Sequence, residues 1–131
     1  MKKGISIWSF TGQPLETCFQ MAQSYGYDGV EVALAENGEV NLNSTKADMA
    51  SVKETANRQG IELFSVASGL YWTYSLSSDL REEREKAKSI VVQQLKVASW
   101  LGCNTILVIP GSVKCGFSDK APIVSYDVVY D

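Results

Sequence analysis

The sequence contains no histidine. Without an imidazole, the residues of this chain cannot form a Ser-His-Asp triad, a Cys-His pair or a zinc site with histidine ligands. Basic tracts are also missing, since 12 Lys and Arg against 15 Asp and Glu give a net charge of −3. No apolar run approaches the roughly 18 residues of a membrane-spanning helix, and the N-terminus lacks the apolar core of a signal peptide. We therefore expect a cytoplasmic protein that binds neither nucleic acid nor membrane.

Cysteine is sparse, and its pattern excludes two further classes of site. Cys18, Cys103 and Cys115 show no metal or redox spacing, and their odd number argues against a disulfide framework. Cys18 and Cys103 are predicted to be small core residues, and Cys115 a free thiol in a loop. A chain of 131 residues, 45% of them apolar, suffices for one domain with a core and is too short for two ordinary ones.

Gly26, Gly60 and Gly102 divide the chain into repeated units. Each ends a helical pattern and is followed within a few residues by an apolar segment typical of a strand. Strands are expected at 4–10, 30–34, 61–68 and 105–109. Helices are expected to begin at Pro14, at Ser44 or Thr45, and at a capping-box variant of Asp79 with Glu82. The last helix should run to Leu101 with an ion pair between Glu82 and Lys86. One side of it should carry Leu80, Arg84, Ala87, Val91, Leu95 (or Gln94) and Ala98.

Repeated strand–helix units of this kind predict an α/β fold with a parallel sheet. The segment 105–109 is apolar at both alternating positions, so both of its faces should be buried. An open doubly wound sheet would usually carry a glycine-rich phosphate loop after the first strand, and residues 9–13 have none. We therefore predict the first four strands of a (β/α)8 TIM barrel. Residues 1–131 would form one N-terminal half-barrel domain, truncated at the start of a fourth helix near 125–131.

Several segments resemble the sugar isomerase/epimerase barrels of the xylose-isomerase-like superfamily. The second strand and the residues before it read Gly26-Tyr27-Asp28-Gly29-Val30-Glu31-Val32, and the third reads Gly60-Ile61-Glu62-Leu63-Phe64-Ser65-Val66. An aromatic loop, a long charged helix and Leu101-Gly102-Cys103-Asn104-Thr105-Ile106 follow. The pattern is most similar to members that act on sugar phosphates, such as hexulose-6-phosphate isomerase and the pentulose-5-phosphate 3-epimerases.

The resemblance implies a metal-dependent isomerase or epimerase that moves a proton next to a carbonyl through an enediolate. In that family a divalent metal (Mn, Mg, Co or Zn) is held by two glutamates, an aspartate and a histidine on strands five to eight. Those strands are not expected here, so no catalytic or metal-binding residue is assigned and this chain alone is expected to bind no metal. It would contribute the rim that faces a sugar or sugar phosphate.

Eight residues are candidates for that rim; Glu31 lies within the second predicted strand, and the others lie at or just after strand ends. Aromatic rings can stack on a sugar or simply pack under a loop, and Glu31 can hold a sugar hydroxyl or pair with an interior basic group. Small residues let a ligand approach the backbone, although Pro110 and Gly111 are equally consistent with a plain strand end. The candidates are Trp8, Glu31, Ser68, Gly69, Tyr71, Trp72, Pro110 and Gly111. Glu36 and Glu39, in a polar loop, are interpreted as solvated charges, and Lys114 is a weak candidate for a phosphate contact.

Two other functions remain open. The chain can be a non-catalytic half-barrel that binds sugar or self-associates through exposed sheet edges, so that two copies complete eight strands. An apurinic endonuclease of the same superfamily is disfavoured by the acidic balance and the missing histidines.

Overall fold

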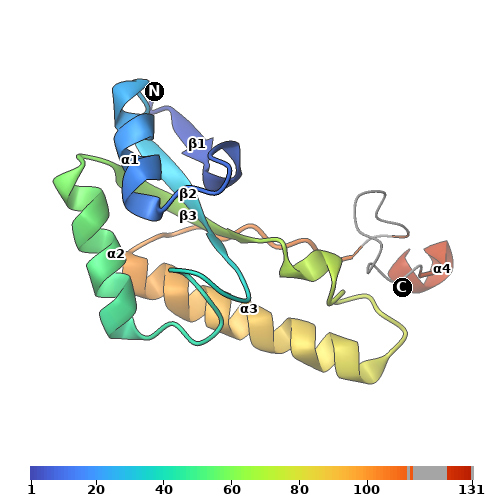
Figure 1. Cartoon of the computed structure of the whole chain (residues 1–131). Coiled ribbons are helices and arrows are strands. Elements are labelled where there is room, and N and C mark those ends of the chain that lie inside the picture. Colours follow the sequence, from blue (N-terminus) through green and yellow to red (C-terminus); the bar gives the residue numbers. More distant parts are fainter. Residues whose placement is uncertain (112, 114–123, 131) are drawn as a thin grey trace.

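Three parallel strands form the centre of the structure, a computed structural model that describes residues 1–111, 113 and 124–130. The strands β1 (Gly4–Ser6), β2 (Gly29–Leu34) and β3 (Glu62–Ser68) lie side by side in chain order. Residues 104–108 continue this order beyond β3 (Figure 1): Leu107 N donates to Val66 O at 2.9 Å, and Val66 N donates to Thr105 O at 3.2 Å. Parallel neighbours in sequence order are what the wall of a barrel requires, so the predicted α/β fold class is confirmed.

The first and fourth predicted strands are shorter than expected. After β1 the chain turns into the 3-10 helix η1 (Ile7–Ser9). The fourth segment makes only a bridge between Ile106 and Val66. Leu107 is 45% exposed, so the prediction that both faces of this segment are buried is wrong for the described chain. Among the residues described, no strand pairs with its outer edge, and an edge segment cannot bury both faces alone.

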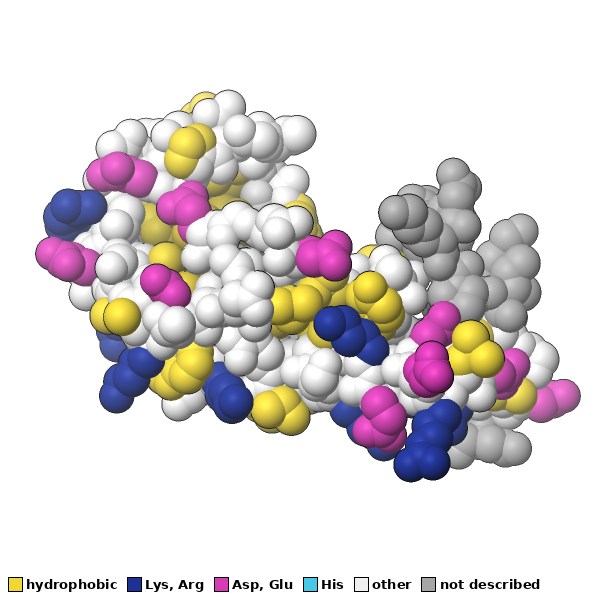
Figure 2. All heavy atoms as spheres, turned by 60° about the horizontal axis from the view of Figure 1, so that its bottom comes forward, with side chains coloured by type: hydrophobic (Ala, Val, Ile, Leu, Met, Phe, Trp, Pro, Cys, Tyr) yellow, Lys and Arg dark blue, Asp and Glu magenta, His cyan; other side chains and the backbone are white. Residues whose placement is uncertain are grey.

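The three main helices pack along one side of the sheet, and the other face carries no helix in the described part of the chain (Figure 1). They are α1 (Leu15–Ser24), α2 (Lys46–Arg58) and α3 (Arg81–Leu101). Two short elements, η2 (Leu70–Trp72) and α4 (Tyr126–Tyr130), lie towards the N-terminal end of α3. Val30, Val32 and Leu34 of β2 are buried in the core between sheet and helices. Figure 2 shows charges of both signs scattered over an outer face, as expected for a solvated helical layer.

The C-terminal ends of the three main helices and the start of α2 agree with the sequence predictions. Gly26, Gly60 and Gly102 have φ of +75°, +65° and +83°, a left-handed conformation that favours glycine. Thr45 caps α2 in a capping box, in which Asp48 N donates to Thr45 Oγ1 at 3.3 Å and Thr45 N donates to Asp48 Oδ2 at 2.7 Å. These two bonds satisfy groups that the first turn leaves without helical partners.

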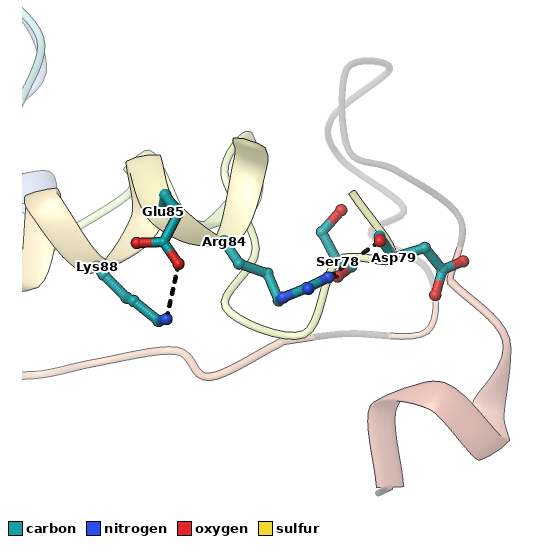
Figure 3. Close-up of polar contacts among 5 residues, drawn as sticks. All are labelled: Ser78, Asp79, Arg84, Glu85 and Lys88. Carbon is teal, nitrogen blue, oxygen red and sulfur yellow. Dashed lines mark hydrogen bonds and ion pairs between the residues drawn. The ribbon is translucent and has the colours of Figure 1, made fainter. Parts of the chain in front are cut away.

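The start of α3 differs from the prediction, because Asp79 and Glu82 do not form the capping box. Leu80 is the N-cap and makes no side-chain cap. Ser78 serves instead, accepting from Leu80 N at 3.1 Å and donating to Glu83 Oε2 at 2.6 Å. Arg84 Nη1 donates to the carbonyl oxygens of Ser78 and Asp79 at 2.6 and 3.0 Å, which fixes the preceding turn to the helix (Figure 3).

The charge pairing and the buried side of α3 also need correction. The ion pairs of the described residues do not include Glu82–Lys86; Lys88 pairs with Glu85 at 2.9 Å (Figure 3), and Lys86 Nζ lies 5.8 Å from the Tyr74 ring centre. Leu80 and Leu95 are more than half exposed. The buried side consists of Ala87, Ile90, Gln94, Val97, Ala98 and Leu101. Of the two residues predicted as alternatives for this side, Gln94 is the buried one and Leu95 is exposed, because the Gln94 amide has hydrogen-bond partners inside the fold.

Gln94 of α3 makes hydrogen bonds to three other segments of the structure. Its side chain is 0% exposed. Its Nε2 donates to Val66 O at 2.7 Å and Leu107 O at 2.9 Å, and its Oε1 accepts from the Tyr71 hydroxyl. One amide thus ties α3 to β3, to the fourth segment and to η2. It provides part of the hydrogen bonding that a longer fourth strand would otherwise supply.

Candidate functional site

A cavity of about 480 Å³ opens at the carboxyl ends of β1 and β2. In a parallel sheet these ends lie at the same edge, and barrel enzymes bind their ligands there. The loop after β1 and the loop after β2 form its walls, with Ala33 and Ala35 of the second strand end contributing small side chains. The lining residues are Ile7, Trp8, Phe10, Thr11, Gly12, Gln13, Leu15, Ala33, Ala35, Asn37, Gly38, Glu39 and Val40.

Trp8 and Gly69 come together at this edge. The Trp8 side chain is 53% exposed and lines the cavity. A Cβ on Gly69 would lie 3.8 Å from Trp8 Cζ2, so the indole approaches the end of β3 closely. Two of the predicted rim residues, from strands that are not neighbours, are therefore adjacent. The exposed ring offers an apolar face to a ligand in the cavity.

Ser68 and Tyr71 lie inside the fold. Ser68 is 1% exposed; its hydroxyl donates to Leu34 O at 2.9 Å and accepts from Leu70 N at 3.2 Å. Tyr71 is 2% exposed, and its hydroxyl is directed at Gln94. Burial raises the pKa of Tyr71 to about 12. These placements give both side chains a part in building the loop after β3, on which the rim depends.

Trp72, Pro110 and Gly111 lie away from the cavity lining. Trp72 is half-buried in η2, and Pro110 is exposed. Gly111 packs on the loop after β3: a Cβ at this position would lie 1.9 Å from Ser77 Oγ and 3.2 Å from Ser75 Oγ. Only a residue without a side chain fits there, so Gly111 brings the fourth segment against the Ser75–Ser77 turn. The structure therefore divides the predicted rim between two places.

Glu31 occupies a polar row across the three strands. The register aligns Ser6 with Glu31 and Glu31 with Ser65. Ser65 Oγ donates to Glu31 Oε2 at 2.7 Å, and no ion pair of the described residues includes Glu31. Ser6 Oγ is buried and has no hydrogen-bond partner in the described structure. Below this row the Phe64 ring covers Gly4 and Gly29, where Cβ atoms would lie 2.8 and 2.6 Å from it.

Sequence reasoning missed the loop residues that form most of the cavity wall. Glu39, expected to be a solvated charge, is exposed but lines the cavity, and its Oε1 accepts a hydrogen bond from Leu15 N at 2.8 Å. That amide begins α1 and has no helical partner. Burial, followed by the Glu39 charge, raises the pKa of the Cys18 thiol. Polar glycine-containing loops after two strands were the available signal, but spacing alone did not indicate that they face each other.

The described residues hold no group of three or more His, Cys, Asp or Glu side chains able to bind a metal ion. No helix in that same part of the chain is long and apolar enough to cross a membrane. Cys18 is buried and Cys103 is half-buried, as predicted. Cys115 and Lys114 lie outside the described residues.

Residues 19–131 match the sequence profile described as xylose isomerase-like TIM barrel. The chain belongs to this family. The match spans most of the sequence and agrees with the parallel strand order and the cavity at its carboxyl edge. Among proteins of curated function, none matches the sequence.

Solved structures share the family's fold with this chain. A D-psicose 3-epimerase in the presence of D-fructose gives a TM-score of 0.71 at 23% identity, covering 99% of this chain and 44% of that one. An Escherichia coli 3-keto-D-glucoside 4-epimerase gives 0.66 at 19%, with coverage of 98% and 46%. A Clostridium cellulolyticum D-psicose 3-epimerase with D-tagatose gives 0.60 at 23%, with coverage of 81% and 36%. This chain of the xylose isomerase-like family thus spans less than half the length of these epimerases.

Proposed function

We propose that this chain forms the sugar-binding rim of an isomerase or epimerase that moves a proton next to a sugar carbonyl. The exposed face of Trp8, held over Gly69 at the mouth of the cavity, is the observation that carries this proposal. An indole face suits the apolar C–H side of a sugar ring, while Thr11, Gln13 and Asn37 offer hydrogen bonds to hydroxyl groups. Family membership supports the reaction class.

Titration with D-fructose tests this binding directly, using the indole N–H signal of Trp8 in a two-dimensional ¹H–¹⁵N NMR spectrum. We expect saturable shifts of Trp8 and of the amides of Ala33 and Gly38. Trp8→Ala should weaken binding by about tenfold, equivalent to about 1.4 kcal/mol. Tyr25→Ala removes another exposed aromatic ring, outside the cavity, and should leave the affinity unchanged. Equal effects of the two substitutions, or no shifts at all, would refute the proposal.

We further propose that a divalent metal (Mn, Mg, Co or Zn) and its ligands belong to strands beyond those described here. The carboxylates of the described residues do not form a fitting cluster, so no step of the reaction is assigned to a metal in this chain. Added Mn²⁺ should change neither the thermal midpoint nor ketose turnover of the 131-residue chain. Metal-dependent turnover by the purified chain would contradict this.

A second candidate function is a non-catalytic half-barrel that assembles with a second copy. The exposed outer edge of the fourth segment favours it, because Leu107 is 45% exposed there. Light scattering after size exclusion should then give the mass of a dimer, and Leu107→Lys should shift it to a monomer. A monomer across the accessible concentration range for the unmodified chain would remove this candidate.

A further inference from the structure

Glu39 is the only charged side chain among the described residues that line the Trp8 cavity. The remaining polar side chains of the lining, Thr11, Gln13 and Asn37, are neutral. A ligand in this cavity therefore meets one negative charge and no compensating cation from the wall. Glu39 is itself exposed, but it lies against the protein wall of the cavity, where a charge acts more strongly than it would in bulk water.

The position of this carboxylate is fixed from two directions. Its Oε1 accepts from Leu15 N at 2.8 Å, the first amide of α1. The next residue, Val40, is 4% exposed and accepts from Ala35 N at 3.1 Å through its carbonyl oxygen, which closes the loop. Glu39 can leave the cavity wall only by giving up the bond to α1. The same bond places the carboxylate at the positive end of that helix, which offsets part of the negative charge but leaves no free helix end to attract a second anion.

We propose that Glu39 determines specificity by restricting the cavity to uncharged sugars and rejecting phosphorylated ones. The proposal rests on the proposed function in one respect, that this cavity is where the sugar binds. A sugar phosphate brings about two negative charges at neutral pH, and these repel a carboxylate that is held in place. The structure thus favours a free ketose or aldose over the sugar phosphates that the sequence resemblance suggested.

The experiment compares the unmodified chain with Glu39→Gln and with Glu36→Gln. Glutamine at position 39 keeps an oxygen that can accept from Leu15 N and removes only the charge. Glu36 is exposed in the same loop, makes no hydrogen bond among the described contacts and does not line the cavity, so it is a matched control. Amides of Gly12, Ala33 and Gly38 report on the cavity while D-fructose, and separately D-fructose 6-phosphate, is added.

A second measurement needs no sugar. A cationic and an anionic nitroxide are added separately, and the paramagnetic relaxation of the same amides is measured with each. The ratio of the two relaxation rates at an amide reports the electrostatic potential near it. In the unmodified chain the cationic probe should relax Gly12 and Gly38 more strongly, and Glu39→Gln should bring the ratio close to one. Glu36→Gln should change the ratio at these two amides much less.

For the sugars we expect D-fructose to bind about tenfold more tightly than its 6-phosphate, and Glu39→Gln to reduce that preference to within about threefold. Equal or tighter binding of the phosphate by the unmodified chain overturns the inference, as does an unchanged preference in Glu39→Gln. If neither sugar shifts the cavity amides, the proposed function fails. The nitroxide ratio still decides whether Glu39 imposes a negative potential, and a ratio near one before substitution overturns it.

Discussion

Replacing Gln94 should weaken the attachment of α3 and η2 to the sheet and so lower the stability of the fold. Gln94→Leu keeps a similar volume but removes three hydrogen bonds, those from the Tyr71 hydroxyl and to the carbonyl oxygens of Val66 and Leu107. Val66 O keeps a partner, because Leu107 N also donates to it at 2.9 Å. The Tyr71 hydroxyl and Leu107 O lose the hydrogen bonds that they make with Gln94.

The expected cost follows from those two groups. A buried polar group left without a partner costs about 1–3 kcal/mol, and the apolar leucine returns part of this by burial. We therefore expect Gln94→Leu to lower the free energy of unfolding by about 2–4 kcal/mol. With a slope of about 1–3 kcal/mol per M in urea, the midpoint should fall by at least about 0.7 M, measured by circular dichroism.

The neighbouring glutamine supplies the control. Gln93 is half-buried and makes one hydrogen bond, from its Nε2 to Ser44 O at 2.9 Å, so Gln93→Leu should cost no more than about 1 kcal/mol. A third variant, Gln94→Glu, tests the same contacts in case Gln94→Leu does not fold. Gln94→Glu places a carboxylate beside two carbonyl oxygens, so its deficit should shrink when the carboxyl is protonated, between pH 8 and pH 5. Similar urea midpoints for Gln93→Leu and Gln94→Leu, with no pH effect in Gln94→Glu, would refute the reasoning.

Three further predictions concern the rim loop, the sheet and a helix cap. Burial raises the folded-state pKa of Tyr71 to about 12. The neutral Tyr71 side chain should therefore stabilise the fold fully below pH 10 and lose this contribution as pH rises towards 12. Absorbance at 295 nm should show one late-ionising tyrosine, which should be missing in Tyr71→Phe. Gly29→Ala places a Cβ 2.6 Å from the Phe64 ring and 2.8 Å from a backbone carbonyl oxygen, so it should cost about 1–3 kcal/mol, and Phe64→Leu in the same chain should recover only part of this. Hydrogen bonds from the Thr45 backbone and side chain lower the pKa of Asp48; Asp48 therefore stabilises the fold above about pH 4 and loses this as pH falls. Asp48→Asn should flatten the acid side of the stability curve, and an unchanged curve would contradict the capping geometry.

The sequence resemblance and the structure agree on the family. The resemblance suggests a phosphorylated sugar, whereas the role that we propose for Glu39 implies an uncharged one. The quoted segments around Glu31 and Phe64 belong to the sheet, and sheet residues indicate the barrel without identifying a substrate. The loop that carries Glu39 lines the cavity, and the uncharged ligand that we propose rests on the charge of this residue. A substrate inference therefore depends on the loops at the carboxyl edge, where the strand signatures carry no information.

Much of the architecture was present in the local sequence. Glycines at 26, 60 and 102 predict helix ends because the left-handed conformation there costs other residues energy, and all three adopt it. The apolar segments between them predict parallel strands because strand–helix repeats need a crossover for each strand. Ser44 and Thr45 both predict a cap, because a hydroxyl there can reach an early amide of the helix, and Thr45 is the one that caps α2. These features depend on neighbours within a few residues, so the sequence alone determined them.

Only the tertiary structure decided the site. That Trp8 lies over Gly69, that Glu39 bonds the first amide of α1, and that Gly111 fits against Ser77 are contacts between residues far apart in the chain. Helical periodicity allows Gln94 on the buried side of α3, but only the folded structure shows why a polar amide is fully buried there: its partners come from β3, η2 and the fourth segment. Local propensity cannot detect such residues, since the free energy that places them comes from groups that only the folded chain brings together.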